Sequence, residues 1–338
     1  MDVPGVSDGL DLEKRLSAAL AARMELLRAG DSEALRLFNG FYEGCPELVA
    51  DLYGRTLLLS GHARPAEQLR PLLEAAQEIL LQRLPEVDCV VHKYRQAKQA
   101  ELRRGLVAYG GLPCQQVNEH GVKYAIDLRL NQDASFYLDT RGLRAWLLEH
   151  AKNWRVLNTF AYTGSLGVAA LAGGAIQVVQ VDRSRKFLAL AQRSARINRL
   201  DLGKMQLRVD DFFSQVAALK RQGALFDCAL LDPPFFSATN KGSLDLLADS
   251  ARLVNKVRPL VQDGGYLVVV NNALFLSGAD YLKTLEGLCA DGYLRIETLI
   301  PAPEDVTGYL ETRLTSPPVD PAPFNHPTKM AVLRVRRK

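Results

Sequence analysis

Hydrophobic positions in the second half of the chain alternate between two spacings, and this alternation predicts strands and helices in turn. Short continuous apolar runs are typical of buried strands, whereas apolar residues at a period near 3.6 are typical of amphipathic helices. The expected strands are 156–160, 176–181, 205–209, 226–231, 265–270, 293–299 and 329–335. The expected helices are 166–172, 185–199, 213–221, 244–260 and 279–291. This order predicts an α/β fold with a mostly parallel, doubly wound sheet and an antiparallel edge formed by the last strands.

The first half of the chain has a different pattern. Residues 8–30 carry apolar residues at helical spacing, and residues 36–59 alternate and break at glycines, which predicts a meander of strands. Further expected elements are a helix over 66–84, a strand over 87–92, a hairpin over 115–128 and a helix over 141–150. We therefore expect an N-terminal helix (1–34), a small α+β domain (35–130) and a larger α/β domain (131–338).

Composition narrows the class of protein. The 338 residues are 48% hydrophobic and 24% charged, as in an ordinary soluble protein, and no apolar run approaches the length of a membrane span. The N-terminus lacks the pattern of a signal peptide, and the five scattered cysteines indicate reduced thiols, so a cytoplasmic location is expected. No metal-ligand spacing is present, and none of the five histidines is paired with another candidate ligand. The net charge of +4 permits an RNA partner without requiring one.

Residues 156–182 read as strand, turn, helix and strand. The turn contains Gly164 and the second strand ends at Asp182. Glycine lets the backbone approach a ligand, the next helix presents free N–H groups, and a carboxylate at the strand end can accept hydrogen bonds from ribose hydroxyls. This spacing predicts half of a nucleotide-binding unit. Structural alternatives stay open, because Gly164 can serve a tight turn alone and Asp182 or Ser184 can cap the next helix.

Two further acids, Asp210 and Asp211, end the third strand of this series. One is placed to accept a hydrogen bond from an adenine amino group and the other to cap the following helix, and we favour Asp210 as the ligand. The turn has one glycine where the dinucleotide fingerprint has three, which argues against a nicotinamide-dependent oxidoreductase.

The tetrapeptide Asp232-Pro233-Pro234-Phe235 follows the fourth strand. The prolines stiffen the chain where α/β sheets bind their ligands, and they fix the carboxylate that precedes them. Phe235 offers a face on which a flipped base can stack. A proline turn with a core phenylalanine is the structural alternative. The tetrapeptide indicates an enzyme that acts on a planar base.

Three motifs carry a family resemblance: 136–141 (Phe-Tyr-Leu-Asp-Thr-Arg), 158–165 (Asn-Thr-Phe-Ala-Tyr-Thr-Gly-Ser) and 231–237 (Leu-Asp-Pro-Pro-Phe-Phe-Ser). They resemble the class I S-adenosylmethionine (SAM)-dependent methyltransferases of bacterial 23S ribosomal RNA. The resemblance extends roughly over residues 35–300. It implies a Rossmann-like fold, SAM as cofactor, ribosomal RNA as partner, no metal, and a small domain that contributes to RNA binding.

The motifs and strand ends together define the expected site. Residues expected to bind SAM are Tyr137, Arg141, Asn158, Phe160, Tyr162, Thr163, Gly164, Ser165, Asp182, Arg183, Ser184, Asp210, Asp211 and Asp232. Residues expected to act on the base are Asp232, Pro233, Pro234, Phe235 and Asn271.

The acceptor atom divides the family into two branches. Methylation of cytosine C5 needs a cysteine thiolate that adds to the ring, whereas guanine N7 carries its own lone pair. Where the cytosine enzymes have that cysteine, this chain has Asn271-Asn272, which looks like the guanine-N7 branch. We therefore favour guanine N7, with Asp232 or Asn271 holding the base edge. A cytosine-C5 enzyme, a nicotinamide-dependent oxidoreductase and a catalytically silent RNA-binding factor remain alternatives.

A basic segment, 92–104, is the expected RNA-backbone contact. It contains Lys93, Arg95, Lys98, Arg103 and Arg104. A solvated helix face is an equally good interpretation, because charge runs usually are one.

Overall fold

The computed structural model describes residues 6–234, 236–239 and 242–337. Two compact units divide the chain: unit 1 is Met1–Leu138 with Pro303–Ser316, and unit 2 is Asp139–Ala302 with Pro317–Lys338. The expected domain boundary at residue 130 differs from this division by eight residues, and no sequence pattern indicates the return of 303–316 to unit 1. In the part of the chain that is described, no helix combines the length and apolarity of a membrane span.

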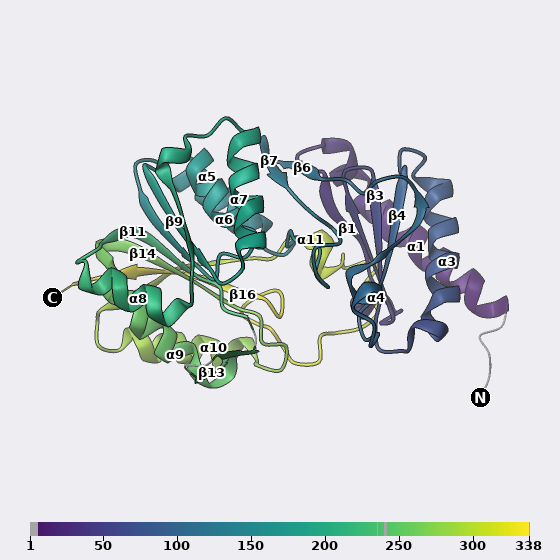
Figure 1. Ribbon diagram of the computed structural model, residues 1–338. Coiled ribbons are helices and arrows are strands. Elements are labelled where there is room, and N and C mark those ends of the chain that lie inside the picture. The colour runs from purple at the N-terminus through teal and green to yellow at the C-terminus, as the bar shows by residue number, and fades with distance from the viewer. Residues whose placement is uncertain (1–5, 235, 240–241, 338) are drawn as a thin grey trace. The chain divides into compact units, whose positions relative to one another are not determined.

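Unit 1 is a five-stranded sheet in the order β1-β2-β3-β4-β5, in which only β3 and β4 run parallel. Helices α1 and α3 lie side by side against the sheet and share its apolar core (Figure 1). The elements are α1 (Val6–Ala29), β1 (Ala34–Asn39), α2 (Gly40–Glu43), β2 (Leu48–Tyr53), β3 (Thr56–Gly61), α3 (Ala66–Arg83), β4 (Cys89–Tyr94), α4 (Ala100–Arg104), β5 (Leu106–Gly110), the hairpin β6 (Gln116–Glu119) and β7 (Val122–Ala125), and α11 (Glu304–Thr307).

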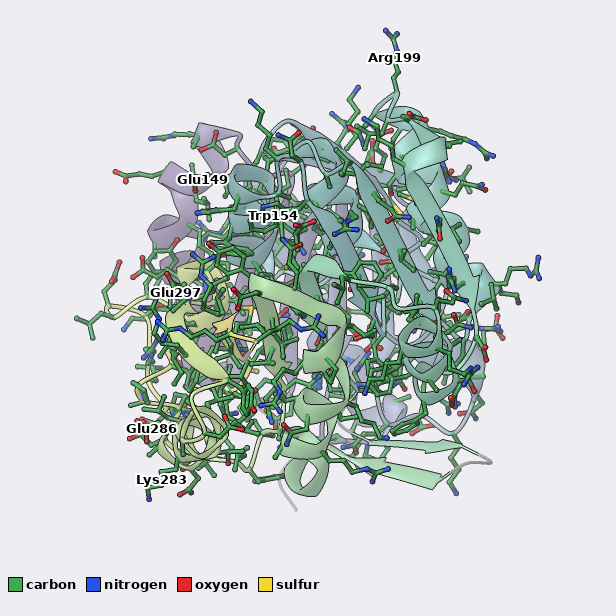
Figure 2. The ribbon with its side chains drawn as sticks, turned by 90° about the vertical axis from the view of Figure 1, so that its left-hand side faces the viewer. Glu149, Trp154, Arg199, Lys283, Glu286 and Glu297 are labelled. Atoms are coloured by element: carbon green, nitrogen blue, oxygen red, sulfur yellow. The ribbon has the colours of Figure 1, made fainter. Side chains whose placement is uncertain are left out.

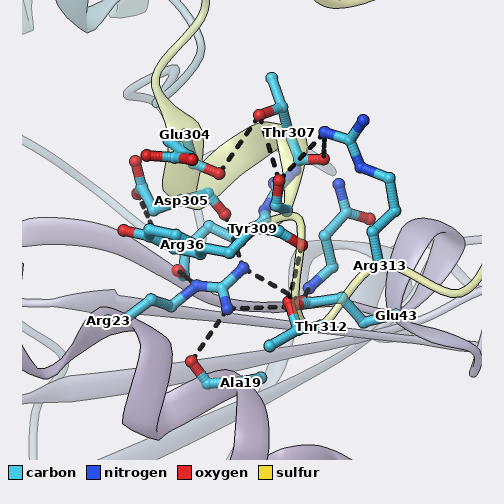
Figure 3. Close-up of polar contacts among 12 residues, drawn as sticks. Ala19, Arg23, Arg36, Glu43, Glu304, Asp305, Thr307, Tyr309, Thr312 and Arg313 are labelled. Carbon is cyan, nitrogen blue, oxygen red and sulfur yellow. Dashed lines mark hydrogen bonds and ion pairs between the residues drawn. The ribbon is translucent and has the colours of Figure 1, made fainter.

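The segment Pro303–Ser316 is held on unit 1 by hydrogen bonds around the buried ion pair of Arg23 and Glu43 (Figure 3). The Arg23 guanidinium is fully buried and donates to both carboxylate oxygens of Glu43, at 2.9 and 3.0 Å. It also donates to the carbonyl oxygen of Asp305 at 2.9 Å, and the Asp305 carboxylate accepts from the backbone N–H of Arg36 at 2.9 Å. Buried charges are tolerated only when paired and hydrogen-bonded in this way, so the segment is part of the unit 1 core.

Unit 2 is a seven-stranded sheet in the order β10-β9-β8-β11-β14-β16-β15. The first five strands are parallel, and β16 runs antiparallel between β14 and β15. Helices α5, α6 and α7 cover one face and α8, α9 and α10 the other (Figure 1). The elements are α5 (Arg141–His150), β8 (Arg155–Thr159), α6 (Ser165–Ala172), β9 (Gln177–Asp182), α7 (Arg185–Ile197), β10 (Met205–Val209), α8 (Phe212–Arg221), β11 (Phe226–Leu231), the hairpin β12 (Phe236–Thr239) and β13 (Gly242–Asp245), α9 (Leu246–Val257), β14 (Val261–Asn271), α10 (Gly278–Cys289), β15 (Leu294–Ile300) and β16 (Lys329–Val335), with 3-10 turns at Leu202–Lys204 and Arg258–Leu260.

The doubly wound sheet with an antiparallel edge is confirmed, and three predictions of elements need correction. The helix expected over 244–260 begins at Leu246, because 242–245 pair with 236–239 as a hairpin. Strand β14 begins four residues before the expected 265, because 261–264 extend the same pairing through an irregular register. Strand β5 is absent from the prediction because its five residues end at Gly110, another glycine follows, and the sequence gives little alternation.

Both tryptophans of the chain lie in unit 2. Trp154, labelled in Figure 2, packs against Tyr266 with ring centroids 5.0 Å apart, and Trp146 lies 5.7 Å from Trp154. Their fluorescence therefore reports the folding of unit 2 separately from unit 1.

Candidate functional site

The turn after β8 has an unusual backbone. Gly164 has φ +75°, and the non-glycine residues Phe160 and Tyr162 have φ +54° and +51°. A Cβ on Gly164 would lie 2.4 Å from the Ala191 Cβ and 2.7 Å from the Gln180 amide nitrogen, so only glycine fits. Left-handed non-glycine residues cost free energy and cluster at functional sites. The turn is therefore shaped tightly against β9 and α7.

Asn158 and Gln180 support this turn from within the sheet. Asn158 is buried, and its side-chain amide donates to the Gln180 Oε1 at 2.9 Å. The Gln180 Nε2 in turn donates to the carbonyl oxygen of Gly164 at 3.3 Å. Asn158, which we expected to bind the cofactor, thus acts on the turn through Gln180.

Asp182 lies at the end of β9 with a fixed carboxylate. One oxygen accepts from the backbone N–H of Tyr162 at 2.9 Å and the other from that of Ser184 at 2.8 Å. Burial raises the pKa of this carboxyl above its ordinary value, and the two backbone donors oppose the shift. The N-cap of α7 is Ser184 and not Asp182, because the Ser184 hydroxyl accepts from the N–H of Phe187 at 3.3 Å. Each Asp182 oxygen retains a lone pair for a ligand hydroxyl.

The next strand ends at Asp210, whose N–H donates to the carbonyl oxygen of Asp182 at 3.1 Å. Asp211 is the N-cap of α8 and accepts from the N–H of Ser214 at 2.9 Å. The Asp210 carboxylate accepts from the Asp211 N–H and from the Gln215 side chain, both at 2.7 Å. Of the two acids, Asp210 is therefore the one that does not cap the helix.

The strand ends bring most of the expected cofactor residues together. Those at the carboxyl ends of β10, β9, β8 and β11 are Asn158, Phe160, Tyr162, Thr163, Gly164, Ser165, Asp182, Arg183, Ser184, Asp210, Asp211 and Asp232. Phe160 stacks on Phe212, with ring centroids 4.7 Å apart, which gives this edge an apolar wall. Arg141 is a buried residue at the start of α5. Tyr137 belongs to unit 1, where its hydroxyl donates to the Asp133 carboxylate at 3.4 Å.

Asp232 follows β11 and is the most perturbed acid of the site. Burial, and secondly the negative charge of Asp139, raise the pKa of its carboxyl to about 7. Part of its surface remains in contact with solvent. Pro233 is buried and Pro234 is exposed, whereas Phe235 lies outside the described residues.

Asn271, expected to hold the base edge, has another role in the structure. Its side chain is fully buried, its amide donates to the Ser250 hydroxyl at 3.1 Å, and its oxygen accepts from the Ala273 N–H at 2.9 Å. It therefore fixes the chain after β14. The exposed neighbour Asn272 is the amide that a ligand can reach.

Sequence reasoning missed three residues of this region. Asp139 lies within the quoted motif 136–141, and its carboxylate accepts from the Thr328 hydroxyl at 2.7 Å. Asn272 was visible as half of an Asn-Asn pair. Lys329 is fully buried beside Asn271 in the β14–β16 pairing, and nothing in its sequence context distinguishes it from a surface lysine.

The basic segment of unit 1 divides into two classes. Lys93 is buried and donates to the carbonyl oxygens of residues 131, 132 and 133, and its burial lowers its pKa to about 7. Arg95 pairs with Asp133 at 2.9 Å, and Arg103 donates to the carbonyl oxygens of residues 97 and 98. Lys98 and Arg104 are exposed, so they are the members of the segment best placed for a polyanion.

Among residues 6–234, 236–239 and 242–337, no group of three or more His, Cys, Asp and Glu side chains is arranged to hold a metal ion.

Comparison with known proteins places these features in context. The sequence profile of a family described as S-adenosylmethionine-dependent methyltransferase matches residues 82–306. A relative in Escherichia coli O139:H28, named ribosomal RNA large subunit methyltransferase I, is 32% identical over 84% of this chain and 73% of the relative. The crystal structure of a methyltransferase complexed with S-adenosylhomocysteine (SAH) superposes with a TM-score of 0.84 at 22% identity, covering 99% of this chain and 83% of the other. A SAM-dependent methyltransferase structure from Streptococcus mutans has a TM-score of 0.82 at 21% identity, with the same coverage.

Proposed function

This chain belongs to the S-adenosylmethionine-dependent methyltransferase family, and we propose that it methylates a base of large-subunit ribosomal RNA, with guanine N7 as the acceptor atom. The enzyme class and the SAM cofactor follow from the family, which removes the nicotinamide-dependent alternative. The RNA substrate is supported by the name and identity of the E. coli relative. The acceptor atom is argued from the residues of unit 2.

The described residues fit a SAM molecule at the carboxyl ends of β8, β9 and β10. The half-buried Asp182 carboxylate is oriented by two backbone donors and can accept from the ribose hydroxyls. Asp210 lies beside it and can accept from the adenine amino group, with Phe160 as an apolar wall. The turn at Gly164 lets the backbone approach the amino-acid end. When bound, SAM supplies an electrophilic methyl group on its sulfonium.

The positions of the cysteines favour guanine N7 over cytosine C5 as the acceptor atom. Carbon C5 of cytosine is reached by covalent addition of a thiolate, so that reaction needs a cysteine at the strand ends. Unit 2 contains only Cys228 and Cys289. Cys228 is fully buried within β11, which raises the pKa of its thiol far above the ordinary value, and Cys289 ends α10. Neither presents a thiolate at the carboxyl edge, whereas guanine N7 requires none.

Asp232 is proposed to recognise the base. An ionised carboxylate can accept two hydrogen bonds from the N1–H and the amino group of guanine, while the N7 lone pair stays free for in-line attack. The exposed amide of Asn272 can donate to O6 of the same base. Because the pKa of Asp232 is about 7 before the base binds, we expect kcat/KM to rise with pH through this region.

The test is transfer of labelled methyl groups from SAM to 23S rRNA from a strain that lacks this gene, followed by mass-spectrometric analysis of the nucleosides. We expect 7-methylguanosine. Protein-free rRNA and assembled subunits should both be assayed, since a chain that binds SAM but labels neither would be the silent RNA-binding factor.

Changing the five cysteines tests whether the target base is guanine or cytosine. A variant in which all are changed to alanine or serine should keep methyl transfer, apart from some loss of stability at the buried Cys89 and Cys228. It should form no covalent adduct with RNA containing 5-fluorocytosine. An adduct with the unaltered protein that disappears when one cysteine is changed would establish the cytosine-C5 reaction instead.

A further inference from the structure

The segment that follows β14 exposes two large apolar side chains. Leu274 and Phe275 keep 43% and 68% of their surface accessible, whereas Ala273 before them is fully buried and Leu276 after them packs against the unit 2 core. Single exposed apolar residues are common on protein surfaces. Here, however, the two side chains project between two anchored residues.

The anchors fix the backbone of this segment. Lys329 Nζ donates to the carbonyl oxygen of Ala273 at 3.0 Å, and Asn271 Oδ1 accepts from the N–H of the same residue. The N–H of Leu276 donates to the Ala273 carbonyl oxygen at 3.3 Å. Burying an ammonium is costly, so a buried lysine used for this purpose indicates that the position of Ala273 matters. Phe275 is thereby presented outward on a rigid support.

The segment lies at the same edge as the proposed reaction centre. Strands β11 and β14 are adjacent and parallel, with Leu231 paired to Val269. Asp232 is therefore level with Val270, about one strand spacing of roughly 5 Å away, and the exposed segment begins just beyond it. Carboxyl ends of parallel strands are where such sheets bind ligands.

We propose that Phe275 is a stacking platform for an unpaired RNA base next to the target nucleotide. This inference rests on the proposed function, because it names the part of the RNA that this edge holds. Every base has a flat apolar face, so an exposed ring on a rigid support binds single-stranded nucleotides with little sequence preference. The structure assigns Lys329 and Asn271 the role of positioning this ring.

The test compares Phe275→Ala, Phe275→Trp and the control Ile176→Ala. Ile176 is also an exposed apolar residue of unit 2, but it lies at the opposite, amino end of β9. Phe275→Ala should raise the KM for rRNA roughly 5- to 150-fold while the Kd for SAM, measured by calorimetry, stays unchanged. Phe275→Trp should restore the KM, and Ile176→Ala should leave both constants as in the unaltered protein. An unchanged KM in Phe275→Ala would overturn the proposal.

A second measurement keeps this inference separate from the proposed function. Stacking quenches tryptophan fluorescence, so a single-stranded RNA oligonucleotide should quench Phe275→Trp beyond the signal of Trp146 and Trp154 in the unaltered protein. If the protein labels no rRNA, the proposed function fails, but this quenching still decides the role of Phe275. No added quenching would refute the platform even in an active enzyme. If Phe275→Ala lost binding to a protein while its binding to RNA stayed unchanged, the platform would also be refuted.

Discussion

Asp232→Asn should change how the stability of unit 2 depends on pH. The pKa of Asp232 rises from 3.8 to about 7 in the folded protein, so the folded state binds more protons than the unfolded state between these values. A carboxyl with a raised pKa therefore favours folding at low pH, and this contribution is lost as the pH rises towards 7. The shift of roughly three pKa units corresponds to about 4 kcal/mol in total. Between pH 5 and pH 8 the loss should be about 2–3 kcal/mol, because part of it has already occurred below pH 5.

The assay is urea unfolding followed by tryptophan fluorescence, which reports unit 2 because Trp146 and Trp154 both lie there. Asparagine is neutral throughout, so the stability of Asp232→Asn relative to the unaltered protein should increase by that amount from pH 5 to pH 8. All other titrating groups are shared and cancel in the difference. Asp139→Asn is the matched variant: it removes the neighbouring negative charge, lowers the pKa of Asp232 and should reduce the pH dependence. A difference between Asp232→Asn and the unaltered protein that stays constant from pH 5 to pH 8 would refute the reasoning.

Three further changes test the rest of the site. Asp182→Ala should weaken SAM binding by about 1–3 kcal/mol in calorimetry, because charge-assisted hydrogen bonds to the ribose are lost; an unchanged affinity would contradict the ribose assignment. Gly164→Ala should lower the unfolding free energy of unit 2 by at least about 1–2 kcal/mol, from the left-handed backbone alone, and native stability in urea would count against the tight turn. Lys98→Glu combined with Arg104→Glu should weaken rRNA binding and reduce its salt dependence. In filter-binding assays Lys93→Met, the matched control, should keep the salt slope while losing stability, and an unchanged slope in the double variant would leave the segment without an RNA role.

The central sheet could be predicted because its strands are buried on both faces. The mostly apolar runs 226–231 and 329–335 coincide with β11 and β16 to the residue. Once the strands are placed, the topology of a parallel sheet brings their carboxyl ends to one edge. Asp182, Asp210 and Asp232 could be assigned to one site for that reason, without any knowledge of their contacts.

The return of 303–316 to unit 1 could not be predicted in the same way. It depends on polar contacts between residues far apart in the sequence: Arg23 and Asp305 are separated by 282 positions. Neither residue belongs to a periodic pattern, and an arginine in an N-terminal helix ordinarily faces solvent. A local sequence pattern carries no information about such a pairing.

The structural roles of Lys93, Lys329 and Asn271 could not be predicted from the sequence. Lys93 and Lys329 resemble surface charges in the sequence, yet each is buried and holds backbone carbonyl oxygens of a neighbouring turn. Asn271 looked like the polar group that contacts the base, yet it fixes the turn that exposes Asn272 and Phe275. In each case the polar side chain serves the backbone, and beside Asn271 it is Asn272 that faces the solvent. A polar pair next to a strand end can therefore mark a constrained segment, and its exposed member is the residue to test for ligand contact.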